Sequence, residues 1–390
     1  MSTIAPWFRV AVAMTAVGWG ANHFAGLLAV YREGHSESFV SIAVGIYAAG
    51  LIPALLVTAV VGDRFDHRAP VRVAVVLSAV GTVLLAFGSA YDALLPVGRF
   101  VAGAATGIVL APGTAWLMDL SRVGAGPRRA TVALTLGFGG GPFVVGLLGQ
   151  WAPAPEVLPY AAHLLLSCVA VAAVWLLPVA PARNAGAARR SWATARATVA
   201  APTFLRTIPL TAPWVFGGAA TAFAIAPGVI TVTTLPVATG AVVLGLTLFT
   251  GVGVQPLAKR LEQRAAGLSL SLGTACAAVG SLVCAWAFRV EWPALLFVIA
   301  LVLGAAYGLL LVGGLARVEA VSLPEDRTRV SAVFYAFSYL GFAAPYVFVL
   351  LTQHLLGPSA VMLVGAAIAA VTVATLPRPR PGAVGGTMVR

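Results

Sequence analysis

The sequence predicts an all-α integral membrane protein whose twelve transmembrane helices form two parallel six-helix repeats. Hydrophobic residues make up 60% of the chain and charged residues only 9%, with a mean hydropathy of +0.97. Soluble domains carry about 25% charged residues, so no soluble fold could cover this much apolar surface. The apolar residues form long runs, each close to the about 20 residues that cross a bilayer. A charged turn, DRFDHRA at Asp63–Ala69, returns as KRLEQRA at Lys259–Ala265 and divides the chain into similar halves.

The apolar runs locate the spans and divide the chain into four regions. The first run is long and is followed by many others, so it is a span and not a signal peptide. We expect an N-terminal six-helix bundle at 1–179, a basic cytoplasmic linker at 180–206, a C-terminal six-helix bundle at 207–376 and a disordered cytoplasmic tail at 377–390. Within the linker, either a surface-bound amphipathic helix or a disordered segment fits the sequence. The twelve predicted spans are 10–30, 38–62, 72–90, 93–119, 130–150, 157–178, 208–227, 237–257, 265–288, 293–316, 329–352 and 357–376.

The basic residues are distributed unevenly between the two sides of the predicted membrane. Of the 24 Lys and Arg residues, only Arg32 and Arg289 fall in turns on one side, and Arg99 falls within a span. Because Lys and Arg collect in cytoplasmic loops, this asymmetry predicts that both termini are cytoplasmic. The net charge of +12 therefore indicates topology and contact with anionic lipid, not a nucleic-acid partner. A single lysine with abundant Ala, Val and Gly suggests a bacterial protein, hence the bacterial cytoplasmic membrane.

The two halves also correspond beyond the charged turns. Gly103–Gly107 in the fourth span matches Gly304–Gly308 in the tenth, and Leu136–Pro142 in the fifth matches Leu340–Pro345 in the eleventh. Each half crosses the membrane an even number of times, so the repeats must run in parallel about an axis along the membrane normal.

With these features, the sequence resembles the major facilitator superfamily over nearly its whole length. The family's loop after the second span reads Gly-x-x-x-Asp-Arg-x-Gly-Arg-Arg. The Asp-Arg pair and the last Arg match here, whereas both glycines and one Arg do not. The resemblance implies a latch between the bundles, in which the Asp63-Arg64 turn faces the start of the eleventh span and Arg68 pairs with Asp119. A merely solvated turn is the alternative. The corresponding positions are Ala59, Asp63, Arg64, Asp66, His67 and Arg68.

Two further family patterns occur in the fourth and fifth spans. Arg99 and Gly103 match Arg-x-x-x-Gly, whose arginine is tied to coupling in proton-coupled relatives; an arginine bonded to backbone carbonyls of a neighbouring helix is the alternative. The fifth span is similar to the antiporter branch's Gly-x-x-x-Gly-Pro-x-x-Gly-Gly, with Val145 replacing one glycine. Close helix packing and a proline kink explain this pattern without any chemistry. The packing residues are Gly137, Gly141, Pro142 and Gly146.

Polar and aromatic residues within the spans are the candidates for a solute pathway. The first span contains the pair Asn22 and His23, and a histidine can exchange a proton near neutral pH. A packed, hydrogen-bonded histidine is the alternative, and His163 in the sixth span is expected to be structural. Asp92 and Arg99 are seven residues apart, which places them on one helical face. The proton-coupling candidates are His23, Arg99 and Asp92. The cavity candidates are Asn22, His23, Tyr47, Arg99, Trp214, Tyr307, Tyr335 and Tyr339.

The absent features narrow the function further. No span has an acidic residue at its middle, which favours a neutral, weakly polar or anionic solute over a strongly cationic one. The sequence has no phosphate-binding loop, catalytic set or metal-ligand cluster, so we expect no enzyme activity, no metal and no cofactor beyond a proton gradient. We predict a monomeric secondary transporter that exports a small organic solute by proton-coupled alternating access. A uniporter or importer of a neutral metabolite is one alternative, and a non-transporting receptor or assembly factor is another.

Overall fold

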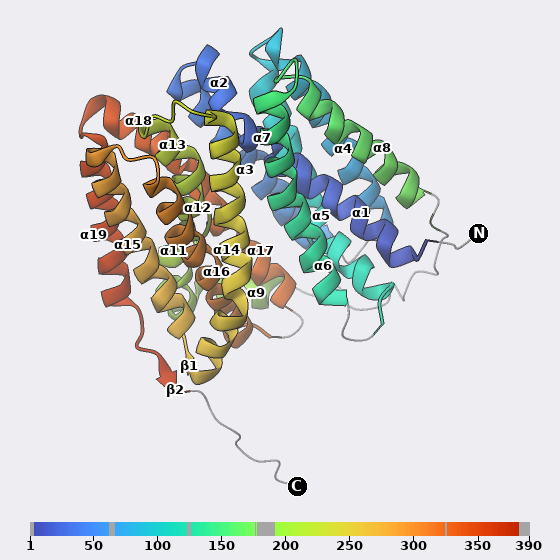
Figure 1. Ribbon diagram of the computed structural model, residues 1–390. Coiled ribbons are helices and arrows are strands. Elements are labelled where there is room, and N and C mark those ends of the chain that lie inside the picture. The colour runs from blue at the N-terminus through green and yellow to red at the C-terminus, as the bar shows by residue number, and fades with distance from the viewer. Residues whose placement is uncertain are drawn as a thin grey trace.

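The computed structural model describes residues 4–61, 67–122, 126–175, 177, 192–323 and 326–381. The helices form two bundles that lie side by side, with the first half of the chain in one and the second half in the other (Figure 1). The N-terminal bundle contains α1 (Pro6–Asn22), η1 (His23–Leu27), α2 (Leu28–Gly34), α3 (Glu37–Val61), α4 (Arg68–Ala86), η3 (Phe87–Ser89), α5 (Leu94–Asp119), α6 (Gly126–Thr135), η4 (Leu136–Gly140), α7 (Gly141–Trp151) and α8 (Leu158–Trp175).

The C-terminal bundle repeats this pattern after two helices of the linker, α9 (Trp192–Ala200) and α10 (Pro202–Leu205). A two-residue strand pair joins the turn after its second span to the segment after its last helix. The elements of the bundle are α11 (Ile208–Thr211), α12 (Pro213–Ala220), η5 (Thr221–Ile225), α13 (Ala226–Val229), α14 (Pro236–Arg264), β1 (Ala265–Ala266), α15 (Leu268–Val290), α16 (Leu295–Val321), α17 (Arg327–Tyr339), η6 (Leu340–Ala343), α18 (Ala344–His354), α19 (Pro358–Thr375) and β2 (Arg380–Pro381).

The predicted all-α, twelve-span fold is confirmed. Within the described residues, 11 helices are long and apolar enough to cross a membrane. The segment Pro6–Gly34, in which η1 interrupts α1 and α2, supplies one more crossing at the predicted position of the first span. The halves are arranged as parallel repeats, since α1 and α12 begin at the same end of the molecule (Figure 1).

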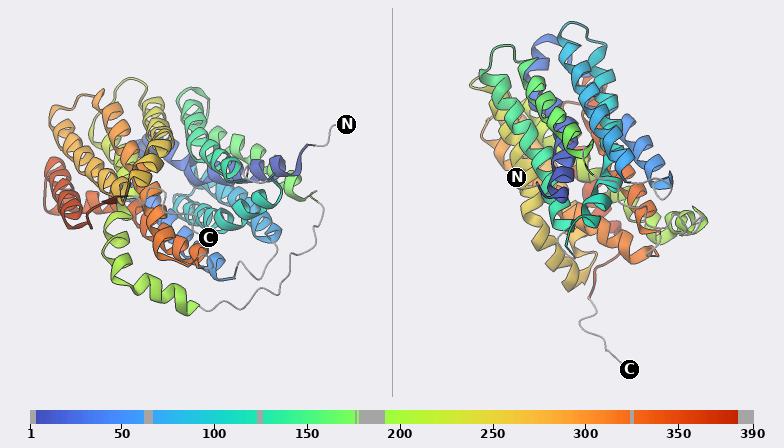
Figure 2. Two further views of the ribbon diagram at one scale, coloured as in Figure 1. Left: turned by 90° about the horizontal axis from the view of Figure 1, so that it is seen from below. Right: turned by 90° about the vertical axis from the view of Figure 1, so that its right-hand side faces the viewer.

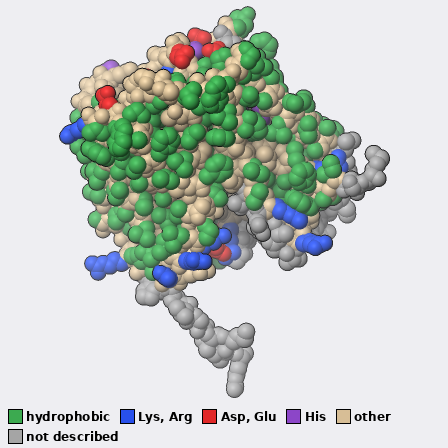
Figure 3. Space-filling view, viewed as in Figure 1, with side chains coloured by type: hydrophobic (Ala, Val, Ile, Leu, Met, Phe, Trp, Pro, Cys, Tyr) green, Lys and Arg blue, Asp and Glu red, His purple; other side chains and the backbone are tan. Residues whose placement is uncertain are grey.

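The two ends of the bundles differ in charge. We call the end where α1 begins and where the chain reaches β2 the terminal end, and the opposite end, which carries the turns around Ser36 and Asp92, the distal end (Figures 1 and 2). In the space-filling view, Lys and Arg side chains gather mostly at the terminal end and Asp and Glu at the distal end, with an apolar belt between them (Figure 3). The belt matches a chain embedded in lipid.

Four spans are irregular near their middle, and three of these irregularities precede a proline. The π-helical turns η4 and η5 precede Pro142 and Pro227, and the 3₁₀ turn η6 precedes Pro345. Proline has no N–H for the preceding turn, so the regular α-helical hydrogen bonding is interrupted there. The fourth irregularity, η1, has no proline and follows the first helix at His23. These breaks lie in spans one, five, seven and eleven.

Two parts of the predicted domain organisation differ from the structure in detail. Residues 192–205 of the linker form α9 and α10, and Ala195 and Phe204 are buried in the cluster that includes Val330 and Phe334 of α17. The tail predicted to be disordered from residue 377 continues in order to Pro381, because β2 pairs antiparallel with β1. Backbone pairing with a distant turn leaves no local sequence signal, so composition alone could not indicate it.

Candidate functional site

A cavity of about 560 Å³ lies between the two bundles. It extends from Phe216 and Tyr339, in the middle of α12 and at the end of α17, to Lys259 and Glu319 in the last turns of α14 and α16. The N-terminal bundle contributes residues of α5, α6 and η4, including Phe138. The cavity therefore reaches the terminal end, and both bundles line it.

Aromatic rings form the deep wall of this cavity. Phe216 stacks on Tyr339, with ring centroids 4.3 Å apart, and lies 5.7 Å from the ring of Tyr307. Tyr335, one turn before Tyr339 on α17, also lines the cavity. Behind them, Tyr47 of α3 meets the edge of Tyr339 at 6.3 Å, so the aromatic cluster joins the two bundles. The structure thus brings three of the predicted cavity residues, Tyr307, Tyr335 and Tyr339, into one lining.

Hydrogen bonds between the bundles close the distal end. Gln150 at the end of α7 accepts hydrogen bonds from the backbone N–H groups of Val237 and Ala238, both at 3.1 Å, in the first turn of α14. These two amides have no partner within their helix, so Gln150 caps it from the other bundle. Ser38 of α3 lies 3.3 Å from Gln353 Nε2 of α18. The described lining of the cavity therefore runs from its aromatic deep wall to the terminal end, whereas these cross-bundle hydrogen bonds lie at the distal end.

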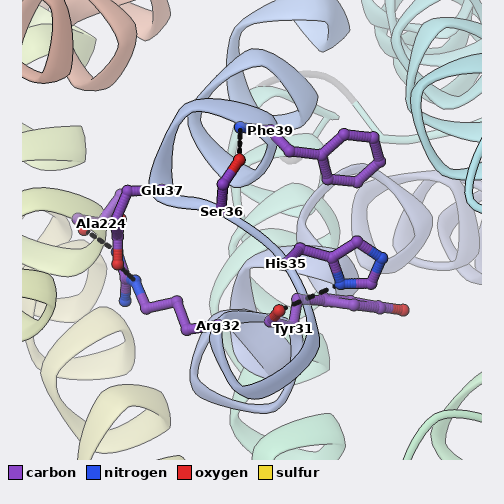
Figure 4. Close-up of polar contacts among 7 residues, drawn as sticks. All are labelled: Tyr31, Arg32, His35, Ser36, Glu37, Phe39 and Ala224. Carbon is purple, nitrogen blue, oxygen red and sulfur yellow. Dashed lines mark hydrogen bonds and ion pairs between the residues drawn. The ribbon is translucent and has the colours of Figure 1, made fainter.

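Arg32 makes the most extensive of these distal contacts (Figure 4). Its Nε donates to Glu37 Oε1 at 2.9 Å, and its Nη2 donates to the carbonyl oxygen of Ala224 in η5 of the other bundle. Gly228, one turn later, lies beside the guanidinium, where a Cβ would meet Arg32 Nη2 at 2.8 Å. The π turn thus offers a carbonyl to the arginine, and the glycine one turn later leaves room for the guanidinium to reach it. From the sequence, Arg32 was expected only to mark the side of the membrane.

Replacing Arg32 by Ala should destabilise the closed distal end. A hydrogen bond involving a charged group contributes about 1.5–3 kcal/mol, so the closed state should lose roughly tenfold or more in population. The measurement is thiol labelling of Ala25→Cys in a background without native cysteines. Ala25, in η1, is 8% exposed and lines the same pocket between the bundles as Arg32. We expect faster labelling with Arg32→Ala and no change with Arg289→Ala, an arginine of the same end; equal labelling rates in all three would contradict this role.

Arg99 is buried within the N-terminal bundle. Its Nη1 donates to Ala21 O at 2.7 Å and its Nε to Ala43 O at 3.1 Å. The guanidinium also lies over the rings of Tyr47 and Phe24, at 4.5 and 5.1 Å. Ala21 belongs to the last turn of α1, where helix carbonyls lack the usual partner four residues on. Arg99 therefore makes the contacts of the structural alternative, bonding the backbone of two neighbouring helices, and does not line the cavity in this conformation.

His23 and His163 form a stacked pair inside the same bundle. Their ring centroids are 5.1 Å apart at an interplanar angle of 17°, and both side chains are fully buried. The hydroxyl of Thr82 lies 2.7 Å from His163 Nδ1 and 3.5 Å from His23 Nε2. Tyr160 meets the His23 ring edge-on at 4.9 Å. The structure thus places His23 among α4 and α8 and away from the cavity, and it makes His163 a direct neighbour of His23.

The backbone partners of the two rings indicate which nitrogens carry hydrogen. His163 Nε2 lies 2.8 Å from Ala16 O, and His23 Nδ1 lies 3.2 Å from Trp19 O. A carbonyl oxygen only accepts, so both of these nitrogens are donors. His163 Nδ1 is then an acceptor facing the Thr82 hydroxyl, whose one hydrogen goes to this nitrogen or to Ser78 O. His23 Nε2 is the position left for an additional proton.

Two further pathway candidates, Asn22 and Trp214, lie in different places. Asn22 Nδ2 donates to Phe138 O at 3.3 Å, the carbonyl that Pro142 cannot bond because it lacks an N–H. Trp214 is directed toward α19, where its Cη2 lies 3.9 Å from the position of a Cβ on Gly365. Both residues are outside the cavity lining.

The expectation that Asp92 shares a helical face with Arg99 is wrong. The helix α5 begins only at Leu94, so Asp92 belongs to the preceding turn and helical spacing does not apply to it. Its exposed carboxylate instead lies 3.2 Å from His35 Nε2 at the distal end. Among the described residues, Asp92 and Arg99 share no hydrogen-bond or ion-pair partner.

The glycine-rich motif of the fifth span packs in two directions. A Cβ on Gly137 would lie 2.5 Å from Thr15 O, and one on Gly141 2.5 Å from Trp19 Cγ, both in α1 of the same bundle. A Cβ on Gly146 would instead overlap the Cβ of Ala241 in α14 of the other bundle. Pro142 begins α7 after the π turn. Gly146 is therefore the position of the motif that sets the distance between the bundles.

The predicted latch lies only partly within the described residues. Asp63 and Arg64 fall outside them. Arg68 is buried in the first turn of α4, and Asp119 is the last residue of α5. His67 Nε2 lies 3.8 Å from Asp119 Oδ2. The pairing of Arg68 with Asp119 stays a prediction.

The start of the eleventh span, where the latch is expected to dock, carries a buried ion pair. Arg329 Nη1 lies 3.3 Å from Asp326 Oδ1, and the two side chains are 6% and 1% exposed. The sequence analysis did not single out this pair, although an Asp-x-x-Arg spacing at a helix start places both charges in one turn. Among the described residues, no group of three His, Cys, Asp or Glu side chains is arranged to hold a metal ion.

The chain was compared with curated protein sequences and with solved structures. No curated protein sequence matches the chain. The peptide transporter POT in complex with sulfate is similar in structure, with a TM-score of 0.73 and 14% identity over 95% of this chain and 92% of that chain. The nucleoside transporter NupG gives 0.68 and 11% over 95% and 98%, and the inward-open xylose transporter XylE from E. coli gives 0.65 and 13% over 94% of each. At these identities, the likeness establishes the fold alone.

The family is established by sequence. The sequence model of the Major Facilitator Superfamily matches residues 10–267, which is well over half of the chain. The fold and the family together indicate a multi-pass membrane transporter and not an enzyme. This protein belongs to the Major Facilitator Superfamily.

Proposed function

We propose that this protein is a proton-coupled secondary transporter that exports a small organic solute by alternating access, with its terminal end in the bacterial cytoplasm. The observation that carries the proposal is the central cavity, which both bundles line, which opens at the terminal end and which cross-bundle hydrogen bonds close at the distal end. The orientation rests on the collection of Lys and Arg at the terminal end. In this orientation the structure corresponds to the cytoplasm-open state.

The lining of the cavity favours an uncharged, weakly polar solute that bears a planar or aromatic group. Phe216 and the three tyrosines offer ring faces, and rings of this kind stack on planar groups. Within the described residues, the hydroxyls of Tyr307, Tyr335 and Tyr339 make no hydrogen bond to protein and are therefore available to a solute. The charged lining residues, Lys259, Glu262 and Glu319, belong to the last turns of α14 and α16 at the mouth.

We propose the His23–His163 pair as the site that carries the coupled proton. An additional proton on His23 Nε2 would point a donor at Thr82 Oγ1, whose own hydrogen is directed to His163 Nδ1 or to Ser78 O. The charged and titratable groups around the pair are Arg99 in α5, Tyr160 in α8 and Tyr31 in α2. The hydroxyl oxygens of the two tyrosines are 2.5 Å apart. The proton site thus adjoins the break in the first span, a place where a movement of η1 would alter its access.

Replacing His23 by Ala should weaken the pH dependence of transport, because the neutral side chain cannot take up a proton. His163→Ala should do the same, since it removes the partner that orients Thr82. The measurement is the initial transport rate against pH in proteoliposomes. His354→Ala, which alters an exposed histidine at the end of α18, is the matched control. A His23→Ala variant that keeps the complete pH profile would exclude the pair from coupling.

Flux measurements with an imposed pH gradient test the transport proposal as a whole. Gradient-driven accumulation of solute in inside-out vesicles supports proton-coupled export. Equilibration of the solute at a rate independent of the pH gradient supports the uniporter. One observation favours this alternative: within the described residues, no histidine or carboxylate lines the deep, aromatic part of the cavity. Absence of flux for every solute of the proposed class would contradict transport and support a receptor.

A further inference from the structure

A second cavity, of about 440 Å³, lies at the terminal end beneath the C-terminal bundle. Three arginines from separate elements line it: Arg206, which follows α10, Arg317 in α16, and Arg378, which lies between α19 and β2. It shares only Glu262 and Ala316 with the lining of the central cavity. Local sequence does not indicate this convergence, because the arginines are far apart along the chain.

The carboxylate of Glu262, which also lines this cavity, accepts hydrogen bonds from two backbone amides. Glu262 Oε1 accepts from Gly267 N at 2.6 Å, and Oε2 accepts from Ser269 N at 3.2 Å. These bonds cap the first turn of α15, after Gly267 has turned the chain at φ +86°. Within the described residues, neither Arg206 nor Arg378 makes an ion pair. Arg206 and Arg378 therefore bring positive charge to this lining, and Glu262 caps the start of α15.

A hydrogen bond anchors Arg317, and strand pairing anchors the segment that carries Arg378. Arg317 Nη2 donates to Thr203 O at 3.1 Å, which ties α16 to α10. The tail that carries Arg378 folds back because Ala265 pairs with Pro381 and Ala266 with Arg380. The buried side chains of Leu270 and Leu376 form an apolar wall of the same cavity. In the space-filling view, Lys and Arg side chains lie along this edge, directly below the apolar belt (Figure 3).

We propose that this arginine-lined cavity binds a phosphate group. Guanidinium groups match phosphate oxygens in geometry and charge, and their hydrogen bonds to phosphate are strengthened by the charges. The location at the border of the apolar belt admits two sources of the same chemistry, the headgroup of an anionic phospholipid in the adjacent leaflet or free phosphate. The apolar wall favours the phospholipid, whose glycerol and first acyl carbons would contact Leu270 and Leu376.

Lipid retention by the purified full-length protein tests the site without any transport assay. The probe is phosphatidylglycerol, titrated against phosphatidylcholine in detergent and quantified by native mass spectrometry. Loss of two charge-assisted contacts in Arg206→Gln/Arg378→Gln should weaken phosphatidylglycerol binding by about tenfold or more. The matched control is Arg260→Gln/Arg264→Gln, which removes the same charge from the exposed end of α14 outside this cavity. Arg206→Lys/Arg378→Lys, with its charge retained, verifies that the pair can be altered without unfolding.

A second measurement separates the two sources. Inorganic phosphate is added at constant ionic strength, and the thermal midpoint is compared between wild type and Arg206→Gln/Arg378→Gln. Selective loss of phosphatidylglycerol in this variant supports the lipid source. Stabilisation by phosphate that is absent from this variant, without lipid preference, supports free phosphate. The site would be overturned by equal losses in the cavity variant and the control, or by unchanged phosphatidylglycerol binding together with unchanged stabilisation by phosphate, whatever the outcome of the flux experiments.

Discussion

Replacing Gly146 by Ala should trap the transporter away from the state described here and reduce transport severely. The added Cβ would overlap the Cβ of Ala241 across the bundle interface, far inside the about 3.5–4.0 Å at which carbon atoms pack. Neither group is the flexible end of a side chain, so the distal ends of the bundles would have to separate. Overpacking of this kind costs about 1–3 kcal/mol, which shifts a two-state equilibrium by roughly fivefold to 150-fold.

The matched control for this variant is Gly140→Ala in the same span. A Cβ at Gly140 meets nothing within 4 Å, so this change should leave transport near the wild-type rate. The measurement is initial solute flux in proteoliposomes, together with thiol labelling of Ala25→Cys in the pocket that Arg32 also lines. Gly146→Ala should raise the labelling rate while it lowers flux. Normal flux and normal labelling in Gly146→Ala would mean that this contact does not hold the distal end closed.

Replacing Arg99 by Ala should destabilise the N-terminal bundle more than any other single charge removal discussed above. The carbonyls of Ala21 and Ala43 lose their guanidinium donors, and the faces of Tyr47 and Phe24 lose a cation. An unsatisfied buried polar group costs about 1–3 kcal/mol, and the emptied volume adds to this, so we expect a total loss of about 3–5 kcal/mol. The measurement is the thermal midpoint of the purified protein in detergent.

The variant Arg99→Lys separates structure from coupling. An ammonium retains the charge but lacks the planar fork that reaches two helices, so the thermal midpoint should recover only in part. If Arg99 acts only through packing, the pH profile of Arg99→Lys should match wild type wherever the protein is folded. An unchanged thermal midpoint in Arg99→Ala would contradict the structural role derived from its contacts.

The spans and their parallel repeat could be predicted because the signals are strong and local. Long apolar runs indicate where the chain crosses the membrane, and the distribution of Lys and Arg indicates which loops are cytoplasmic. The two copies of the charged turn indicate the internal repeat. The close packing at Gly137, Gly141 and Gly146 also followed from the glycine spacing. The contact of Gly146 with Ala241 of the other bundle could not be predicted, because glycine spacing indicates which residues share a helix face but not which helix packs against that face.

The positions of the polar residues were harder to predict. His23 lies at the middle of the first span, as counting indicated, yet the 3₁₀ turn directs it into the bundle and onto His163. Periodicity assumes a regular helix, so a break in the helix changes which face each residue occupies. Phe216 was missed as a cavity residue, and Trp214, two positions earlier, was preferred on residue type alone. The prolines Pro142, Pro227 and Pro345 were the available signal that these spans are irregular.

Distances between spin labels at the two ends of the bundles test alternating access most directly. One pair joins Gly34→Cys and Thr233→Cys across the distal end, and the other joins Arg122→Cys and Arg264→Cys across the terminal end, all exposed positions. Pulsed dipolar measurements would be made in lipid nanodiscs, with and without Gly146→Ala. The account predicts two populations at each end, and Gly146→Ala should lengthen the distal distance while it shortens the terminal one. Single unchanged distances at both ends, or ends that open together, would contradict it.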